Sequence, residues 1–122
     1  MCGIVGYLGK EDAKKIILSG LSRLEYRGYD SAGICLKEDK DLSLYKSVGR
    51  IQALEQLTRS IHHTHTGIGH TRWATHGKVT KDNAHPHQSA GGRFFVVHNG
   101  VIDNYKELEL TYLSDVTLKS QT

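Results

Sequence analysis

A cysteine directly follows the first methionine, and this placement gives it more chemistry than an ordinary cysteine has. In the plainer interpretation, Cys2 is a small buried side chain at the start of an apolar run. Removal of Met1, which cellular aminopeptidases carry out when the next side chain is small, would leave Cys2 with a thiol and a free α-amine. An α-amine with a pKa near about 7.7–8.0 can act as a base at neutral pH. One residue would then supply both a nucleophile and its proton acceptor.

An Asn-Gly pair follows the apolar segment 93–98. Asn99 and Gly100 are the leading signature of a type I′ hairpin turn, so a purely structural role is possible. The Asn99 amide and the Gly100 N–H could also point at one spot and form an oxyanion hole for a tetrahedral acyl intermediate. The two interpretations are compatible, and the dipeptide alone does not decide between them.

The segment 70–77 contains the only tryptophan and an arginine suited to anion binding. We expect an exposed Arg72, beside Thr75, to bind a carboxylate through guanidinium and hydroxyl hydrogen bonds. Trp73 could be a lid over a ligand or part of the core, and composition favours the core.

All eight histidines lie between residues 62 and 98. Zinc sites usually combine histidine with cysteine or carboxylate ligands at short spacings, and the sequence has neither such a spacing nor an HExxH motif. We therefore expect solvated or structurally bonded imidazoles, with no metal and no other cofactor.

Hydrophobic patterning predicts the elements that must position these residues. The helix prediction at 12–26 is the strongest, because apolar and small residues recur on one face from Ala13 to Leu24. The other helices are expected around 51–57 and 105–113. Strands are expected at 2–8, 31–37, 42–47, 66–72 and 93–98, with another beginning at 115–119. This mixture of helices and strands indicates an α+β fold or a layered sandwich.

Size and charge exclude several classes of protein. The 122 residues suffice for one small domain or part of a larger one, and 38% of them are hydrophobic. The net charge of +3 is dispersed, which gives little support to nucleic-acid binding. No apolar run is long enough to span a membrane and the N-terminus does not resemble a signal peptide. The two cysteines, without a secretory signal, favour a reducing compartment, and we expect the cytoplasm.

Five segments, taken together and in this order, resemble the N-terminal glutaminase domain of the glutamine–fructose-6-phosphate aminotransferase family, which are class II glutamine amidotransferases. They are residues 1–6, 23–33, 70–77, 83–87 and 98–100. The related phosphoribosyl amidotransferases share the cysteine start and an Asn-Gly pair. They do not typically carry both the 23–33 and the 70–77 segments.

The resemblance implies a four-layer αββα Ntn-hydrolase sandwich, of which residues 1–122 would be the N-terminal portion. The remainder of the glutaminase domain and the C-terminal isomerase domains would be absent. The implied substrate is glutamine, and the products are glutamate and ammonia. In the longer parent, expected to be a homo-oligomer, ammonia would pass to fructose 6-phosphate to form glucosamine 6-phosphate.

The resemblance also implies a role for each candidate residue. Cys2 would be the nucleophile after loss of Met1, and Asn99 with Gly100 would stabilise the oxyanion. Arg72 would pair with the glutamine α-carboxylate. The remaining implied residues hold the substrate or order its surroundings: Thr75 and His76 beside the substrate, Trp73 on a closing loop, and Arg27 near Cys2.

Two rival functions stay open at this stage. One is a non-catalytic glutamine- or partner-binding module, because the chain ends before an aspartate that binds the substrate amine in the family. The other is the glutaminase portion of a glutamine phosphoribosylpyrophosphate amidotransferase, which would deliver ammonia to a different acceptor. We also expect marginal stability, because one face of a two-sheet core would be uncovered.

Overall fold

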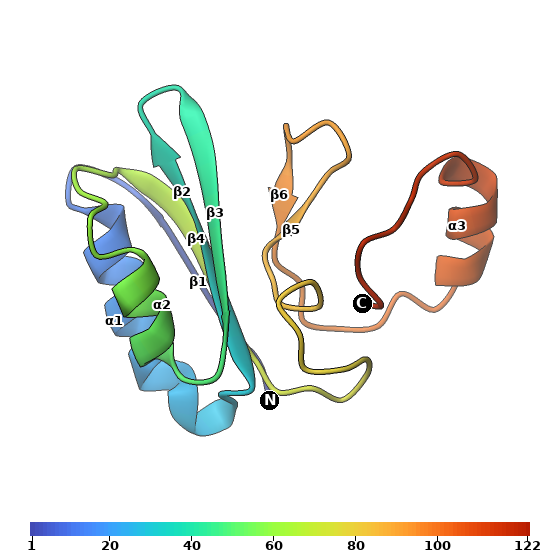
Figure 1. The fold of residues 1–122 in the computed structure, drawn as a ribbon, viewed down its shortest axis with the longest axis horizontal. Coiled ribbons are helices and arrows are strands. Elements are labelled where there is room, and N and C mark those ends of the chain that lie inside the picture. The colour runs from blue at the N-terminus through green and yellow to red at the C-terminus, as the bar shows by residue number, and fades with distance from the viewer.

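Two helices cover one face of a four-stranded sheet, and a small second sheet lies over the other face (Figure 1). A computed structural model describes all residues from 1 to 122. The layers run from α1 (Ala13–Leu24) and α2 (Ile51–Leu57), through the two sheets, to α3 (Tyr105–Tyr112) on the far side. This αββα order confirms the predicted α+β architecture.

The large sheet has the strand order β1-β4-β2-β3, and every neighbouring pair is antiparallel. Its strands are β1 (Gly3–Leu8), β2 (Ser31–Glu38), β3 (Asp41–Val48) and β4 (Thr66–Arg72), each within a few residues of its prediction. Gly3 of β1 pairs with Thr71 of β4. The start of the chain therefore lies beside the end of β4, where the predicted arginine is.

Helix α1 begins where the sequence supplies a side-chain cap. The Asp12 carboxylate accepts the Lys14 N–H at 3.2 Å and the Thr64 hydroxyl at 2.8 Å. These contacts satisfy a helix-end donor and join the helix to the segment before β4. The helix continues into a short 3₁₀ turn, Glu25–Arg27. No helix of the chain is long and apolar enough to cross a bilayer.

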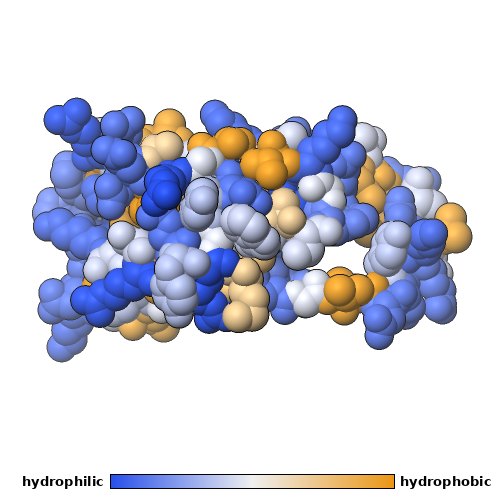
Figure 2. Space-filling view, turned by 90° about the horizontal axis from the view of Figure 1, so that it is seen from below, coloured by the Kyte–Doolittle hydropathy of each residue, from blue (hydrophilic) through white to orange (hydrophobic).

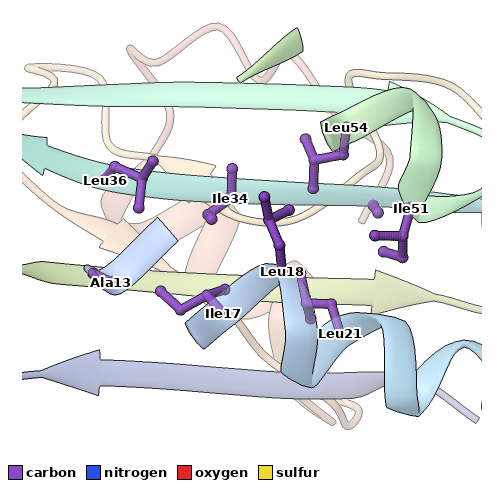
Figure 3. Packing of buried hydrophobic residues seen from close by; sticks show 9 residues of the cluster. Ala13, Ile17, Leu18, Leu21, Ile34, Leu36, Ile51 and Leu54 are labelled. Carbon is purple, nitrogen blue, oxygen red and sulfur yellow. The ribbon is translucent and has the colours of Figure 1, made fainter. Parts of the chain in front are cut away.

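The hydrophobic core lies between the helices and the large sheet (Figure 3). It contains nine buried residues from α1, α2 and β2, among them Ile17, Leu21, Ile34 and Leu54. Strand β4 lets α1 approach closely, because a Cβ atom on Gly69 would overlap the side chains of Ile17 and Leu21. A strand that alternates its side chains between two faces can thus present small residues to the helix and larger ones to the second sheet.

The second sheet is smaller than predicted. It consists of β5 (His87–Gln88), which the sequence analysis missed, and β6 (Phe95–Val96), which is the only paired part of the predicted strand 93–98. The segment before β5 packs so closely on β2 that a Cβ on Gly33 would overlap the His85 carbonyl oxygen. Two paired residues carry no alternation that sequence patterning could detect.

In the C-terminal third, the strand prediction at 115–119 is wrong, and so is the hairpin interpretation of Asn99 and Gly100. Residues 115–119 form no strand, since no neighbouring strand is there to pair with them. Asn99 and Gly100 form no hairpin, because the chain after Gly100 turns into α3 instead of returning as a strand. The third predicted helix is present as α3, but none of its residues is buried.

Candidate active site

One cavity of about 500 Å³ collects nearly all the predicted site residues. It lies where the start of β1, the end of β4 and the segment after β6 meet. Seen from below, a gap also opens between the α3 end of the molecule and the rest (Figure 2). Seven of the eight predicted residues line the cavity: Cys2, Arg72, Trp73, Thr75, His76, Asn99 and Gly100.

The Cys2 thiol is half-buried and is held by the backbone at the end of β4. The Trp73 N–H donates to Cys2 Sγ at 3.4 Å, and Sγ lies 3.7 Å from the Trp73 carbonyl oxygen. Cys2 is not in a disulfide. These two backbone contacts fix the position of the sulfur at the cavity.

Arg72 is buried, so the prediction of an exposed arginine is wrong. Its guanidinium donates to the carbonyl oxygens of Lys78 at 2.8 Å and Gly77 at 3.4 Å, and also to that of His76. A buried guanidinium needs acceptors, and this loop supplies them. No carboxylate of the chain pairs with Arg72. Its positive charge therefore remains available to an anion in the cavity.

Trp73 is 45% exposed, so the interpretation as a core residue is wrong. Its ring packs edge-on against Tyr29, with centroids 6.0 Å apart. The following residue is also fixed, because the Ala74 N–H donates to Asp30 Oδ2 at 2.8 Å. The loop that carries Thr75 and His76 along the cavity is thus anchored at its start.

Asn99 and Gly100 present unused hydrogen-bond donors at the cavity. Asn99 Oδ1 lies 2.7 Å from His70 Nε2. Neither the Asn99 side-chain NH₂ nor the Gly100 N–H has an acceptor within the chain. Two free donors on adjacent residues are what an oxyanion hole requires.

Arg27 is the one predicted site residue that does not line the cavity. Its carbonyl oxygen accepts a hydrogen bond from the Met1 ammonium group, and its guanidinium lies 3.7 Å from Met1 Sδ. Arg27 therefore contacts the residue before Cys2 and not the cavity itself.

A stack of histidines forms part of the site and was missed by the sequence analysis. The rings of His70 and His85 are stacked at 4.5 Å, and those of His85 and His87 lie 4.2 Å apart. Burial, together with nearby positive groups such as Lys46, lowers the pKa of His85 to about 3 and that of His87 to about 4. His70 and His85 line the cavity, as does His98. The gathering of all histidines within 62–98 was the available signal.

The end of the chain forms another missed wall of the cavity. Asn83 is buried and binds Gln121 twice, donating to Gln121 Oε1 at 3.0 Å and accepting the Gln121 N–H at 2.7 Å. Both Gln121 and Thr122 line the cavity. A lone asparagine in a polar loop gives no sequence signal for such pairing.

The chain closely matches part of several curated proteins. It is 58% identical over all 122 residues to the glutamine–fructose-6-phosphate aminotransferase (isomerizing) of Shouchella clausii, and 57% identical to that of Bacillus subtilis. The chain spans 20% of the length of each relative. No family model matches it.

Solved structures agree on the fold. The glutamine phosphoribosylpyrophosphate amidotransferase from B. subtilis, complexed with ADP and GMP, matches 96% of this chain with a TM-score of 0.76 and 27% identity. A structure described as the allosteric regulatory enzyme of purine biosynthesis matches with a TM-score of 0.80, also at 27% identity. In each case 26% of the solved chain is covered. The chain therefore shares the fold of these solved enzymes and is similar in sequence to about one fifth of the length of the curated aminotransferases.

Proposed function

We propose that this chain carries the glutaminase site of a glutamine–fructose-6-phosphate aminotransferase and releases ammonia from the glutamine side chain. The observation that supports this most directly is the set of residues that line one cavity. It joins a cysteine thiol, an arginine without a carboxylate partner and two free donors at Asn99 and Gly100.

In this proposal Arg72 binds the glutamine α-carboxylate. Its guanidinium is held in place by the loop carbonyls, so little conformational freedom is lost when the ligand binds. Thr75 and His76 hold the substrate from the same loop. Trp73, at the mouth of the cavity, covers the bound amino acid and limits the access of water.

The proposed reaction proceeds through a thioester. The Cys2 sulfur attacks the amide carbon, and the tetrahedral oxyanion accepts hydrogen bonds from the Asn99 amide and the Gly100 N–H. The thiol proton passes to the Cys2 α-amine, which is free once Met1 is removed, and then to the departing ammonia. Water then attacks the thioester and releases glutamate. Arg27, which contacts Met1 in the structure, would help to order the new N-terminus.

The proposed acceptor of the ammonia is fructose 6-phosphate. The 58% identity to an aminotransferase supports this choice over a phosphoribosylpyrophosphate acceptor, which rests on structures at 27% identity. The acceptor site would belong to isomerase domains beyond residues 1–122 of a homo-oligomeric parent. We place the enzyme in the cytoplasm, away from nucleic acids and membranes, where Cys2 would remain reduced.

A non-catalytic glutamine-binding role is the competing proposal. It is supported by one observation: with Met1 in place, the Cys2 nitrogen belongs to a peptide bond and cannot act as a base. Intact mass separates the two proposals, because retained Met1 favours the binding role and its loss permits catalysis.

Covalent labelling tests the nucleophile. The chain with Met1 removed is treated with the glutamine analogue diazo-oxo-norleucine, and the labelled peptides are identified by mass spectrometry. We expect Cys2 to be labelled and Cys35 to stay unmodified, since burial raises the pKa of the Cys35 thiol to about 11. Cys2→Ala should abolish labelling and glutaminase turnover, whereas Cys35→Ala should retain both. Labelling confined to Cys35 would refute the assignment.

A further inference from the structure

His70 contacts the predicted oxyanion donor from inside the sheet. It is 1% exposed, lies on β4 two residues before Arg72, and its Nε2 is 2.7 Å from Asn99 Oδ1. The stacked His85 ring covers one face of the imidazole. The other ring nitrogen, Nδ1, is buried and has no partner. The Asn99 contact is therefore the one side-chain hydrogen bond that the ring makes.

The identity of the two atoms in this contact indicates where the proton of the His70 ring lies. A carbonyl oxygen can only accept, so the hydrogen bond to Asn99 Oδ1 requires a proton on His70 Nε2. Burial lowers the pKa of His70 by more than its hydrogen bond to Asn99 raises it, and the charge of Arg72 adds to the lowering, so the ring stays neutral near pH 7. A neutral imidazole carries one proton. With that proton on Nε2, the bare nitrogen is Nδ1, in agreement with its lack of an acceptor.

We propose that His70 is a positioning residue for the oxyanion hole: its Nε2–H binds Asn99 Oδ1 and thereby turns the Asn99 NH₂ group toward the cavity. This inference rests on the proposed glutaminase function and adds a residue to it. His70 does not touch the substrate. It acts through Asn99: the side-chain oxygen of Asn99 binds His70, and the side-chain nitrogen has no acceptor in the chain.

The opposite arrangement would work against catalysis. If the proton were on Nδ1, the bare Nε2 would accept from the amide, and Asn99 would rotate its oxygen toward the cavity. A carbonyl dipole would then repel the developing oxyanion instead of stabilising it. The position of one buried proton thus determines the sign of the dipole that Asn99 presents.

Nuclear magnetic resonance tests the proton position directly in the 15N-labelled chain. The two ring nitrogens of a neutral histidine have well-separated 15N shifts. We expect protonated Nε2 and bare Nδ1 for His70 near pH 7. We also expect the Asn99 side-chain amide resonances to shift in His70→Leu and to stay near their wild-type positions in His70→Gln, whose amide can still donate. A proton on Nδ1 would overturn the proposal whatever the catalytic activity is.

Kinetics of the Met1-processed chain test the catalytic consequence. Loss of an oxyanion-hole donor lowers kcat by about 10²–10³-fold, so misaligning it in His70→Leu should lower kcat by about 10–100-fold with little change in KM. His70→Gln should recover most of the loss. Alkylation of Cys2 by iodoacetamide forms no oxyanion, and its rate in His70→Leu should match the wild type.

A double-mutant cycle keeps the test valid if the leucine variant is poorly folded. In an Asn99→Ala background, replacing His70 by glutamine or leucine should lower kcat no further. Equal kcat values in the single variants His70→Leu and His70→Gln would show that the ring only fills space. A loss of Cys2 alkylation in parallel with the loss of kcat would show the same. Failure of the proposed function would look different, since the Met1-processed wild type would then show no glutaminase turnover, or its turnover would survive Cys2→Ala.

Discussion

The Arg72 side chain has two roles at the cavity: it holds the loop that lines the cavity, and it places a positive charge there. Its guanidinium donates to three consecutive carbonyl oxygens of residues 76–78, yet it lines the cavity and has no carboxylate partner. A fork of N–H donors suits both tasks, whereas a lysine ammonium cannot bridge the same acceptors. The loop and the substrate therefore depend on the same side chain.

Arg72→Lys should impair substrate binding more than chemistry. Hydrogen bonds to charged groups contribute about 1.5–3 kcal/mol, so we expect KM for glutamine to rise on the order of 10–100-fold, with a smaller effect on kcat. Steady-state glutaminase assays check this. The matched control is Arg59→Lys, which changes an exposed arginine outside the cavity and should leave both KM and kcat unchanged. An unchanged KM for Arg72→Lys would exclude the α-carboxylate as its partner.

For single residues, the sequence predicted which side chains form the site better than it predicted how buried each of them is. The positions of Cys2, Arg72 and Asn99 in their motifs were sufficient to expect one site, and the cavity brings them together. The burial of Arg72 and the exposure of Trp73 were both predicted wrongly. Both depend on which distant segments pack nearby, and no local pattern records that.

The segment 85–87 joins the second sheet to the large one through its histidines. His85 stacks on His70 of β4, and the next ring of the stack, His87, begins β5. Burial lowers the pKa of both side chains below the ordinary value of 6.5, to about 3 for His85 and about 4 for His87. The same region holds the positive groups Lys46 and Arg72, which disfavour further positive charge.

This cluster should make the stability of the chain sensitive to acid. The unfolded histidines take up protons near pH 6.5, whereas the folded ones resist protonation until about pH 3–4. The free energy of unfolding should therefore be unaffected by these groups above pH 6.5 and fall steadily as the pH is lowered toward 4. Urea denaturation at several pH values measures this.

Two variants separate the cluster from other titrating groups. His85→Gln removes one buried imidazole and should flatten the loss of stability between pH 6.5 and 4. His62→Gln removes an exposed histidine outside the stack and should leave the wild-type slope. If both variants keep the wild-type slope, the stack does not contribute to the pH dependence.

Helices and strands were predictable where the pattern that specifies them lies within their own residues. The periodicity of α1 and the apolar runs of β1 to β4 placed these elements within a few residues. The strand expected at 115–119 and the hairpin at Asn99 depended on a pairing partner that is not there. The two-residue strands β5 and β6 exist because they pair with each other and pack near β2, which only the folded chain reveals.

The whole molecule is unevenly buried. The α1–sheet–α2 half contains the hydrophobic core, whereas the α3 half has none of its helix residues buried. Apolar atoms flank the gap beside α3 in Figure 2, and Leu110 of α3 is 78% exposed. We therefore expect backbone amides of β1, β2 and β4 to exchange slowest with solvent and those of α3 to exchange fastest.

Two leucine substitutions quantify this difference. Leu21→Ala, in the core under α1, should lower the free energy of unfolding by about 2–5 kcal/mol. Leu110→Ala, on α3, should change it by no more than about 0.5 kcal/mol. Urea denaturation measures both. Comparable losses would mean that α3 is packed in solution, and would contradict the exposure of Leu110 described here.

Strand β4 has consequences for how the chain can misfold. Its glycines 67 and 69 face α1, while His70 and Arg72 face the cavity. A slip of one residue would exchange these faces, placing an imidazole and a guanidinium beneath the helix and lining the cavity with glycine. Misaligned chains would lose the apolar interior and the anion-binding wall together. Selection for a correctly folded protein and selection for a reactive one would then favour the same alignment of this strand.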